Sequence, residues 1–308
     1  MLRSALQAGE RVVMSGQNQN ISPSTLRQKV SKLGDLVRWE QTLFALPIAL
    51  ASALWAARGW PSLASLALVL LAMVSARTAG MAANRLIDAK IDAANPRTKD
   101  RPLPAGRMTA STVLQLLVVS LAVLAASAYL LNPLCFRLCP LAFFLLLIYS
   151  FLKRWTWACH FGLGAVQACG PLGAWFGVTG EFAWAPLWLG FGAAFWMAGF
   201  DILYALDDEL HDRKHGIRSV PARFGSVKAC RISRLCHLVA FGFWLIFAAS
   251  VNAGAGFAIG LGAVGSLLVW EHVLVRPGKL DQLPLAFFRV NSIISTVLLL
   301  GTLGDIYL

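Results

Sequence analysis

The sequence predicts an all-α integral membrane protein with nine transmembrane helices. Three observations predict this fold class. The chain has 308 residues, of which 57% are hydrophobic and only 14% are charged, whereas soluble domains carry about a quarter charged residues. The hydrophobic residues lie in long runs, and runs of roughly 18 residues with few charges are typical of membrane spans. These runs lack the alternation of barrel strands, so helices are the structure expected to satisfy the backbone in lipid.

Nine apolar segments, punctuated by polar residues, are the expected spans. Their expected limits are 42–57, 63–84, 110–131, 138–152, 157–178, 184–206, 231–250, 252–272 and 285–305. Two long charged connections cover about 85–109 and 207–230. Residues 36–308 are therefore expected to form a single transmembrane domain. Residues 1–35 are expected to be a disordered polar leader without a cleavable signal peptide, in which Met14 is an alternative start.

The distribution of positive charge predicts the orientation in the membrane. The net charge is +12, and the basic residues lie between apolar runs, which indicates membrane orientation and not nucleic-acid binding. If the nine segments alternate in direction, 23 of the 27 Lys and Arg residues fall on one side. Positive charge marks the cytoplasmic side, so we expect a cytoplasmic N-terminus and an external C-terminus, with a bacterial inner membrane as the default location.

The first acidic cluster begins where the second expected span ends. Asn84, Asp88 and Asp92 recur every four residues. On a helix, each step of four residues turns the side chain by only about 40°, so all three project from one face.

The second acidic cluster begins inside the sixth expected span. Asp201, Tyr204, Asp208 and Asp212 are spaced at i, i+3, i+7 and i+11, which predicts a single helical stripe. Asp201 lies within an apolar segment, where a charge costs at least about 2.5 kcal/mol, so its presence there favours a function.

The two clusters together favour a magnesium–diphosphate site on the cytoplasmic side. Carboxylates on one helix face repel each other, and a divalent cation removes the repulsion. Mg²⁺ prefers one or two carboxylates together with water and substrate phosphate oxygens. Charged residues at the ends of spans commonly lie there only because the membrane interface is polar. That explanation suits a single residue better than it suits two regularly spaced acidic stripes. Basic residues that could bind phosphate on the same side are Arg85, Arg97, Lys99, Arg101, Lys153, Arg154, Arg213, Lys214 and Arg218.

Four segments carry a resemblance to a known family. NRLIDAKIDAANPRTKDRPLPAG at 84–106 and DILYALDDELHDRKHGIRSVPARFG at 201–225 resemble the two Asp-rich motifs of the UbiA superfamily of intramembrane prenyltransferases. EQTLFALP at 40–47 and YSFLKRWT at 149–156 also resemble blocks of that family, and the resemblance covers most of the chain from about residue 33. The nearest branch is similar to the 4-hydroxybenzoate polyprenyltransferases, including relatives proposed to serve menaquinone synthesis through a dihydroxynaphthoate.

The resemblance implies a fold, a cofactor and a reaction. It implies nine helices around a central cavity open to lipid, and transfer of a polyprenyl group from an isoprenyl diphosphate to an aromatic acid in ubiquinone or menaquinone synthesis. The implied Mg²⁺ ligands are Asn84, Asp88, Asp92, Asp208 and Asp212. Arg85 and Asp207 depart from the pattern of many members, which leaves the acceptor open.

Further roles are expected around this implied site. By the resemblance, Lys153 would contact the diphosphate and Arg154 the carboxylate of the acceptor. Asp201 or Asp207 is a candidate base for the ring proton, and Arg77, on the face of Asn84, is expected to orient the first cluster. The remaining candidates for substrate binding or for lining the cavity are Tyr149, Tyr204, His160, Gln167, Phe161, Trp175 and Trp196. For His160 a hydrogen bond between helices is the favoured alternative, and for Phe161, Trp175 and Trp196 it is ordinary packing.

Two other functions are compatible with parts of the sequence. A polytopic transporter would explain nine helices and a midspan charge, but it does not explain two acidic stripes at one face that run in the same direction. The second alternative function is that of a prenyltransferase of the same family with another acceptor, such as haem, a chlorophyll precursor or a glycerol phosphate lipid. The ALP and KR blocks favour an aromatic acid. The oligomeric state and the prenyl chain length do not follow from the sequence.

Overall fold

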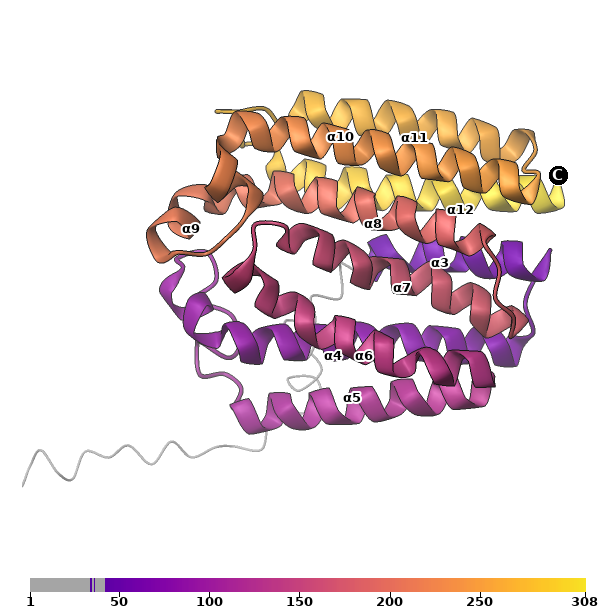
Figure 1. The fold of residues 1–308 in the computed structure, drawn as a ribbon, viewed down its shortest axis with the longest axis horizontal. Coiled ribbons are helices and arrows are strands. Elements are labelled where there is room, and N and C mark those ends of the chain that lie inside the picture. Colours follow the sequence, from indigo (N-terminus) through magenta and orange to yellow (C-terminus); the bar gives the residue numbers. More distant parts are fainter. Residues whose placement is uncertain (1–33, 35, 37–41) are drawn as a thin grey trace, which may run out of the picture.

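The computed structural model describes Gly34, Leu36 and residues 42–308, and these form an all-helical bundle (Figure 1). Apart from Gly34, the expected leader lies outside the described residues. Within the described part, nine helices of 16 residues or more lie roughly parallel. They are α3 (Thr42–Ala57), α4 (Leu63–Ala94), α5 (Ala110–Leu131), α6 (Pro133–Trp155), α7 (Cys159–Thr179), α8 (Ala185–Tyr204), α10 (Val220–Val251), α11 (Ala255–Leu274) and α12 (Asn291–Tyr307). Three short elements complete them: η2 (Ala205–Asp208), α9 (Glu209–His215) and η3 (Leu285–Val290).

Seven helices in the described residues are long and apolar enough to cross a membrane. The helices α3 and α7 are not among them. The described part of α3 has 16 residues, fewer than the roughly 20 that a span needs. In α7 the apolar run is diluted by glycines and by His160 and Gln167. The expected count of nine spans is therefore not confirmed.

Two helices extend further than their apolar segments. The helix α4 continues past the expected limit of 84 to Ala94, so it carries the whole first cluster. The helix α10 begins at Val220 and not at 231, because Ser219 Oγ accepts a hydrogen bond from the N–H of Ala222 and Pro221 lies in the first turn. Its first turn is separated from the rest by a kink at Gly225, where φ is 80° and ψ is 162°. Polar residues continue these helices out of the apolar region, which a pattern of hydrophobicity does not reveal.

The expected single stripe from Asp201 to Asp212 is interrupted. The helix α8 ends at Tyr204, and the 3₁₀ helix η2 leads into α9, which ends at His215 and is capped by Gly216 with a φ of 68°. A 3₁₀ helix turns about 20° more per residue than an α-helix, so its four residues rotate the start of α9 by roughly 80°. Asp212 therefore does not share a helix face with Asp201, and the prediction of one continuous stripe is wrong.

The core joins α8 to the C-terminal helices through large aromatic side chains. Trp196, Trp244, Phe200, Phe247 and Phe257 are fully buried. The indole N–H of Trp196 donates to Asn291 Oδ1 at 2.8 Å. Trp196 lies in this packed core, as ordinary packing, the favoured expectation for this residue, predicts. A buried indole is satisfied here by a polar partner on a neighbouring helix.

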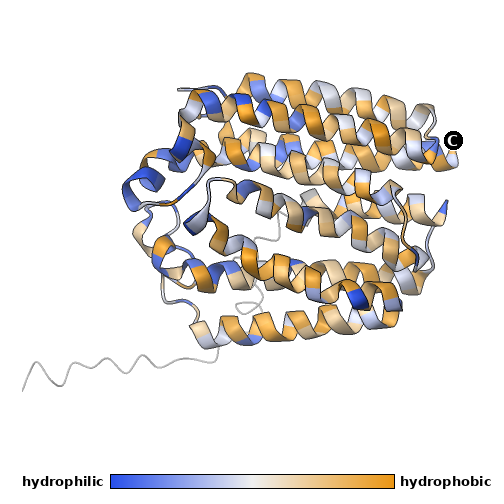
Figure 2. Ribbon diagram, in the orientation of Figure 1, coloured by the Kyte–Doolittle hydropathy of each residue, from blue (hydrophilic) through white to orange (hydrophobic). Residues whose placement is uncertain are grey.

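Polar residues gather at one end of the bundle. Figure 2 shows helices that are hydrophobic along most of their length, with hydrophilic residues concentrated around α9 and the adjacent start of α10. The end of α4 and the connection that follows it lie at this same end (Figure 1). Both acidic clusters are therefore positioned where the apolar bundle meets a polar surface.

Candidate active site

Asp88 is the most buried carboxylate of the first cluster. It has no exposed surface, and Asn84 Nδ2 donates to its Oδ2 at 2.7 Å. Two cations from the end of α6 neutralise it: Lys153 Nζ lies 2.5 Å from Oδ2 and Arg154 Nη1 lies 3.1 Å from Oδ1. Arg154 also donates to the carbonyl of Ile87 at 2.7 Å. The KR pair of α6 is thus fixed against the acidic face of α4.

Asp92 is neutralised by arginines from its own part of the chain. Arg101 Nη1 donates to both carboxylate oxygens at 2.8 Å, and Arg85 Nη1 lies 3.8 Å from Oδ2. Arg85 and Asp92 are both buried, and Arg85 also donates to Asn84 Oδ1 at 3.2 Å. The Thr98 hydroxyl donates to the carbonyl of Asp92 at 2.9 Å, which holds the following loop against the helix end.

Asp208 joins the second cluster to the first. Arg97, in the loop after α4, donates through Nε to Asp208 Oδ1 at 3.0 Å and through Nη2 to Oδ2. Arg97 Nη1 also donates to the Tyr204 hydroxyl at 3.0 Å, and Asn95 Nδ2 donates to Asp208 Oδ1 at 3.1 Å. The loop after α4 therefore bridges the two acidic motifs.

Asp212 has a different environment. It is buried on α9, and Ser219 Oγ donates to its Oδ2 at 2.8 Å. Lys214 lies on the exposed side of α9 and makes no ion pair within the described part of the chain. Asp212 is thus four residues after Asp208 in the chain, but its hydrogen bond comes from Ser219 and not from Arg97.

Asp201 is paired with a histidine from the neighbouring helix. His160 Nδ1 lies 2.7 Å from Asp201 Oδ2, and the backbone N–H of Val220 donates to His160 Nε2 at 3.2 Å. Since Nε2 accepts a hydrogen bond, the proton on Nδ1 is the one donated to Asp201. His160 is only 3% exposed and is hydrogen-bonded between helices, which is the favoured of the two expectations for this residue. The carboxylate of Asp201, within an apolar helix, is thus satisfied by a hydrogen bond from His160.

Two further candidates lie along the same face as the first cluster. The Tyr149 hydroxyl donates to the carbonyl of Gly80 at 2.9 Å, which ties α6 to α4 one turn before Asn84. Arg77 is half-buried on α4, seven residues before Asn84. Both residues lie nearer the middle of the bundle than the acidic cluster does.

Three polar partners of the clusters were missed in the sequence. Asn95 donates to Asp208, Ser219 donates to Asp212, and Ser150 Oγ accepts from Asn84 Nδ2 at 3.2 Å. Asn95-Pro96 is a turn signal after the first stripe, and Ser219, with Pro221 two residues later, is a signal for the start of a helix. These signals predict local structure, and their contacts with the acidic residues depend on the fold.

The carboxylates fit Mg²⁺ in donor type. Within the residues that the structure describes, no three His, Cys, Asp or Glu side chains are grouped closely enough to hold a metal ion by themselves. Carboxylates spaced in this way do not suit structural zinc, which needs four protein ligands. They suit Mg²⁺, which binds through one or two carboxylates and completes its shell with water and substrate phosphates. Asp88, Asp92 and Asp208 offer those oxygens, and Lys or Arg now balances their charge.

Comparison with known proteins places this arrangement in a family. A model of the UbiA prenyltransferase family matches residues 45–293. A 4-hydroxybenzoate octaprenyltransferase of Vibrio campbellii is 31% identical over 275 residues, which cover 88% of this chain and 92% of the relative. A 4-hydroxybenzoate octaprenyltransferase of Pseudomonas fluorescens is 34% identical over 230 residues, which cover 73% of this chain and 76% of the relative.

Solved structures share the fold. The apo structure of a UbiA homolog from Aeropyrum pernix K1 matches with a TM-score of 0.79 and 28% identity, covering 86% of this chain and 98% of that one. A UbiA homolog from Archaeoglobus fulgidus bound to DMAPP and Mg²⁺ matches with a TM-score of 0.68 and 20% identity, covering 89% of this chain and 99% of that one.

Proposed function

We propose, because the chain belongs to the UbiA prenyltransferase family, that this prenyltransferase moves a polyprenyl group from an isoprenyl diphosphate to an aromatic acid in quinone synthesis. The observation that carries the proposal is the pair of acidic clusters joined by Arg97 at one end of an apolar bundle. The relatives named 4-hydroxybenzoate octaprenyltransferase support 4-hydroxybenzoate as the acceptor. A dihydroxynaphthoate is the alternative acceptor.

The acidic clusters would hold Mg²⁺ and, through it, the diphosphate. Asn84, Asp88, Asp92, Asp208 and Asp212 are the proposed ligands. Bound Mg²⁺ would neutralise negative charge on the departing diphosphate. The homolog from Archaeoglobus fulgidus that was solved with DMAPP and Mg²⁺ supports this cofactor.

The cations at the site would change partners during the reaction. Lys153, Arg97 and Arg101 now pair with carboxylates. Once a metal balances those carboxylates, the same side chains can bind diphosphate oxygens and stabilise the charge that develops there. Arg154, beside Lys153, would bind the carboxylate of the acceptor.

The transfer itself needs an environment without water. The allylic C–O bond breaks, the diphosphate leaves, and a ring carbon of the acceptor forms the new C–C bond with the prenyl carbon. Water would quench the cationic prenyl carbon, and an apolar cavity open to lipid would exclude it while admitting the prenyl chain. The ring proton would pass to a carboxylate, for which Asp201 and Asp207 are the candidates.

The proposal includes a location of the protein in the cell. The apolar spans and the bacterial relatives support an integral protein of a bacterial inner membrane. The concentration of Lys and Arg at the end that carries α9 supports a cytoplasmic active site and N-terminus.

Turnover by the purified protein tests this function. The protein is incubated with Mg²⁺, a labelled polyprenyl diphosphate and a panel of aromatic acids. We expect prenylated product that requires Mg²⁺ and that falls by at least about 10²-fold in Asp88→Ala and Asp208→Ala, since each removes a proposed metal ligand. Glu181→Ala, an exposed acid outside both clusters, is the control and is expected to retain full turnover. Unchanged turnover in both Asp variants would remove the proposed metal site.

A further inference from the structure

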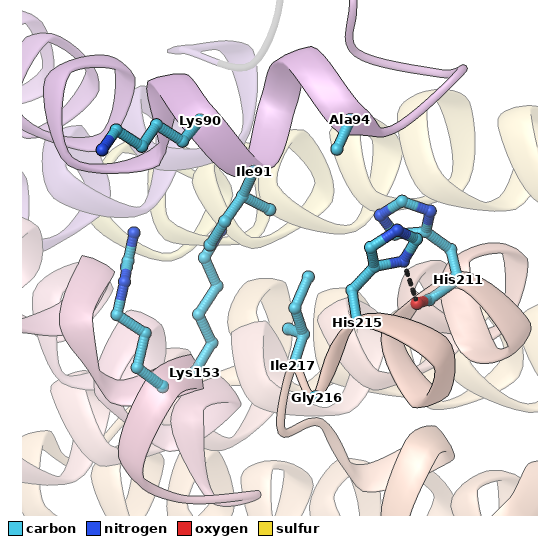
Figure 3. A pocket seen from close by; sticks show the side chains of 9 residues that line it. Lys90, Ile91, Ala94, Lys153, His211, His215, Gly216 and Ile217 are labelled. Atoms are coloured by element: carbon cyan, nitrogen blue, oxygen red, sulfur yellow. Dashed lines mark hydrogen bonds between the residues drawn. The ribbon is translucent and has the colours of Figure 1, made fainter.

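A pocket of about 300 Å³ lies between the ends of α4 and α6 and the short helix α9 (Figure 3). Four of its lining residues are exposed, Lys90, Ala94, His215 and Gly216, so the pocket opens to the aqueous side. Its other lining residues are Ile91, Lys153, Arg154, His211 and Ile217. Lys153 and Arg154 are the side chains that hold Asp88, so the pocket adjoins the candidate active site.

The polar lining of this pocket is basic. Five of the nine lining residues are Lys, Arg or His, and none of the nine is acidic. Lys153 and Arg154 are already paired with Asp88. Lys90 makes no ion pair with any described residue, and His211 Nε2 is buried without a hydrogen-bond partner among them. The pocket therefore offers an ammonium group without an ion pair and a buried imidazole nitrogen without a partner, and both suit an anion once that nitrogen carries a proton.

The remaining lining suits a flat ring. Ile91, Ala94 and Ile217 supply apolar contacts. The imidazoles of His211 and His215 stack with their centroids 4.0 Å apart and their planes at 25°, and His215 Nδ1 donates to the carbonyl of His211 at 2.9 Å. Figure 3 shows this stacked pair across the pocket from Lys90. Basic and apolar walls in one small pocket are complementary to an aromatic carboxylate.

We propose that this pocket binds the aromatic carboxylate acceptor as it enters from the aqueous side, with Lys90 and His211 contacting its carboxylate. The proposal rests on the proposed function and adds residues that neither acidic stripe contains. Of the two substrates, the prenyl diphosphate carries a long apolar chain that belongs in the lipid or the bundle. The aromatic acid is the substrate that dissolves in water, and this pocket faces water. Free diphosphate, the other soluble anion of the reaction, is the competing occupant.

Steady-state kinetics with each substrate varied in turn test the proposal. We expect Lys90→Gln and His211→Gln each to raise the KM for 4-hydroxybenzoate about tenfold, the loss expected for one hydrogen bond to a charged group. The KM for the polyprenyl diphosphate is expected to stay unchanged, and Lys90→Arg is expected to restore the KM for the acid. Lys228→Gln, an exposed lysine on α10 that does not line the pocket, is the matched control.

A binding measurement separates this proposal from the proposed function. Equilibrium binding of labelled 4-hydroxybenzoate to the purified protein is expected to weaken in Lys90→Gln, while inhibition by added diphosphate stays as in the wild type. Weaker inhibition by diphosphate with an unchanged KM for the acid would overturn the proposal and assign the pocket to diphosphate. Normal transfer with wild-type kinetics in both variants would overturn it and leave the proposed function intact. Acid binding that depends on Lys90 without any prenyl transfer would support the pocket and contradict the proposed function.

Discussion

Arg97 is the residue on which the connection between the two acidic clusters depends. It uses all three guanidinium nitrogens, two on Asp208 and one on Tyr204. A lysine presents a single ammonium and cannot reproduce this fork. We expect Arg97→Lys to lower kcat/KM for the polyprenyl diphosphate about tenfold and Arg97→Gln to lower it about 10²-fold, because the glutamine also removes the charge. Initial rates at saturating Mg²⁺ measure both effects.

Tyr204→Phe is the control for this prediction. It removes the hydrogen bond from Arg97 Nη1 but leaves both bonds to Asp208 and the stacking of the guanidinium over the ring at 5.0 Å. We expect a loss of no more than about tenfold, as for a single hydrogen bond. Wild-type kinetics in Arg97→Lys would show that the fork geometry has no role in turnover.

At the scale of helices, α7 and α8 are in close contact at Gly164, which has no side chain to separate them. A Cβ on Gly164 would lie 2.3 Å from the carbonyl oxygen of Ala194, and a backbone atom cannot move aside cheaply. We expect Gly164→Ala to destabilise the protein by about 1–3 kcal/mol, as overpacking does. The effect is measured by size-exclusion chromatography in detergent, as the temperature at which heating removes the monodisperse peak.

The same helix supplies the matched control. A Cβ on Gly170 would meet no atom within 4 Å. Gly170→Ala should therefore leave thermal stability unchanged or slightly raise it, because alanine favours the helix more than glycine does. Equal melting of the two variants would mean that α7 and α8 are not packed this closely.

The helices also show how much of the fold could be predicted from the sequence. Long apolar runs located the nine long helices, and a spacing of four placed Asn84, Asp88 and Asp92 on one face of α4. The ends of α4 and α10 were not predicted, because polar residues continue both helices beyond the apolar pattern. The break at η2 was not predicted either, since a pattern of spacing assumes an unbroken helix.

The partners within the site were harder to predict than its members. The residue types and spacings identified Asp88 and Asp208, but Asp88 pairs with Lys153, 65 positions away, and Asp208 pairs with Arg97, 111 positions away. No local signal specifies such pairs. The pairing of His160 with Asp201 likewise depends on how α7 packs against α8.

For the whole molecule, the decisive property is that both clusters, α9 and most of the basic connections lie at one end of the bundle. The connection between α7 and α8, which carries Glu181, lies at the other end. Positive charge is retained on the cytoplasmic side of bacterial membranes. This arrangement predicts which end faces the cytoplasm independently of any measurement of turnover.

Labelling of single cysteines tests that orientation. The six native cysteines are free in the structure and would be replaced by alanine, after which Lys99→Cys and Glu181→Cys are introduced separately at exposed positions. In vesicles from an expressing bacterium, we expect a membrane-impermeant maleimide to label Lys99→Cys only when the cytoplasmic face is outward and Glu181→Cys only when it is inward. The opposite pattern would place the acidic clusters on the external side, where a prenyl diphosphate made in the cytoplasm could not reach them. Labelling of both positions from one face would mean that an even number of crossings separates them, and that one of α5, α6 and α7 does not cross the membrane.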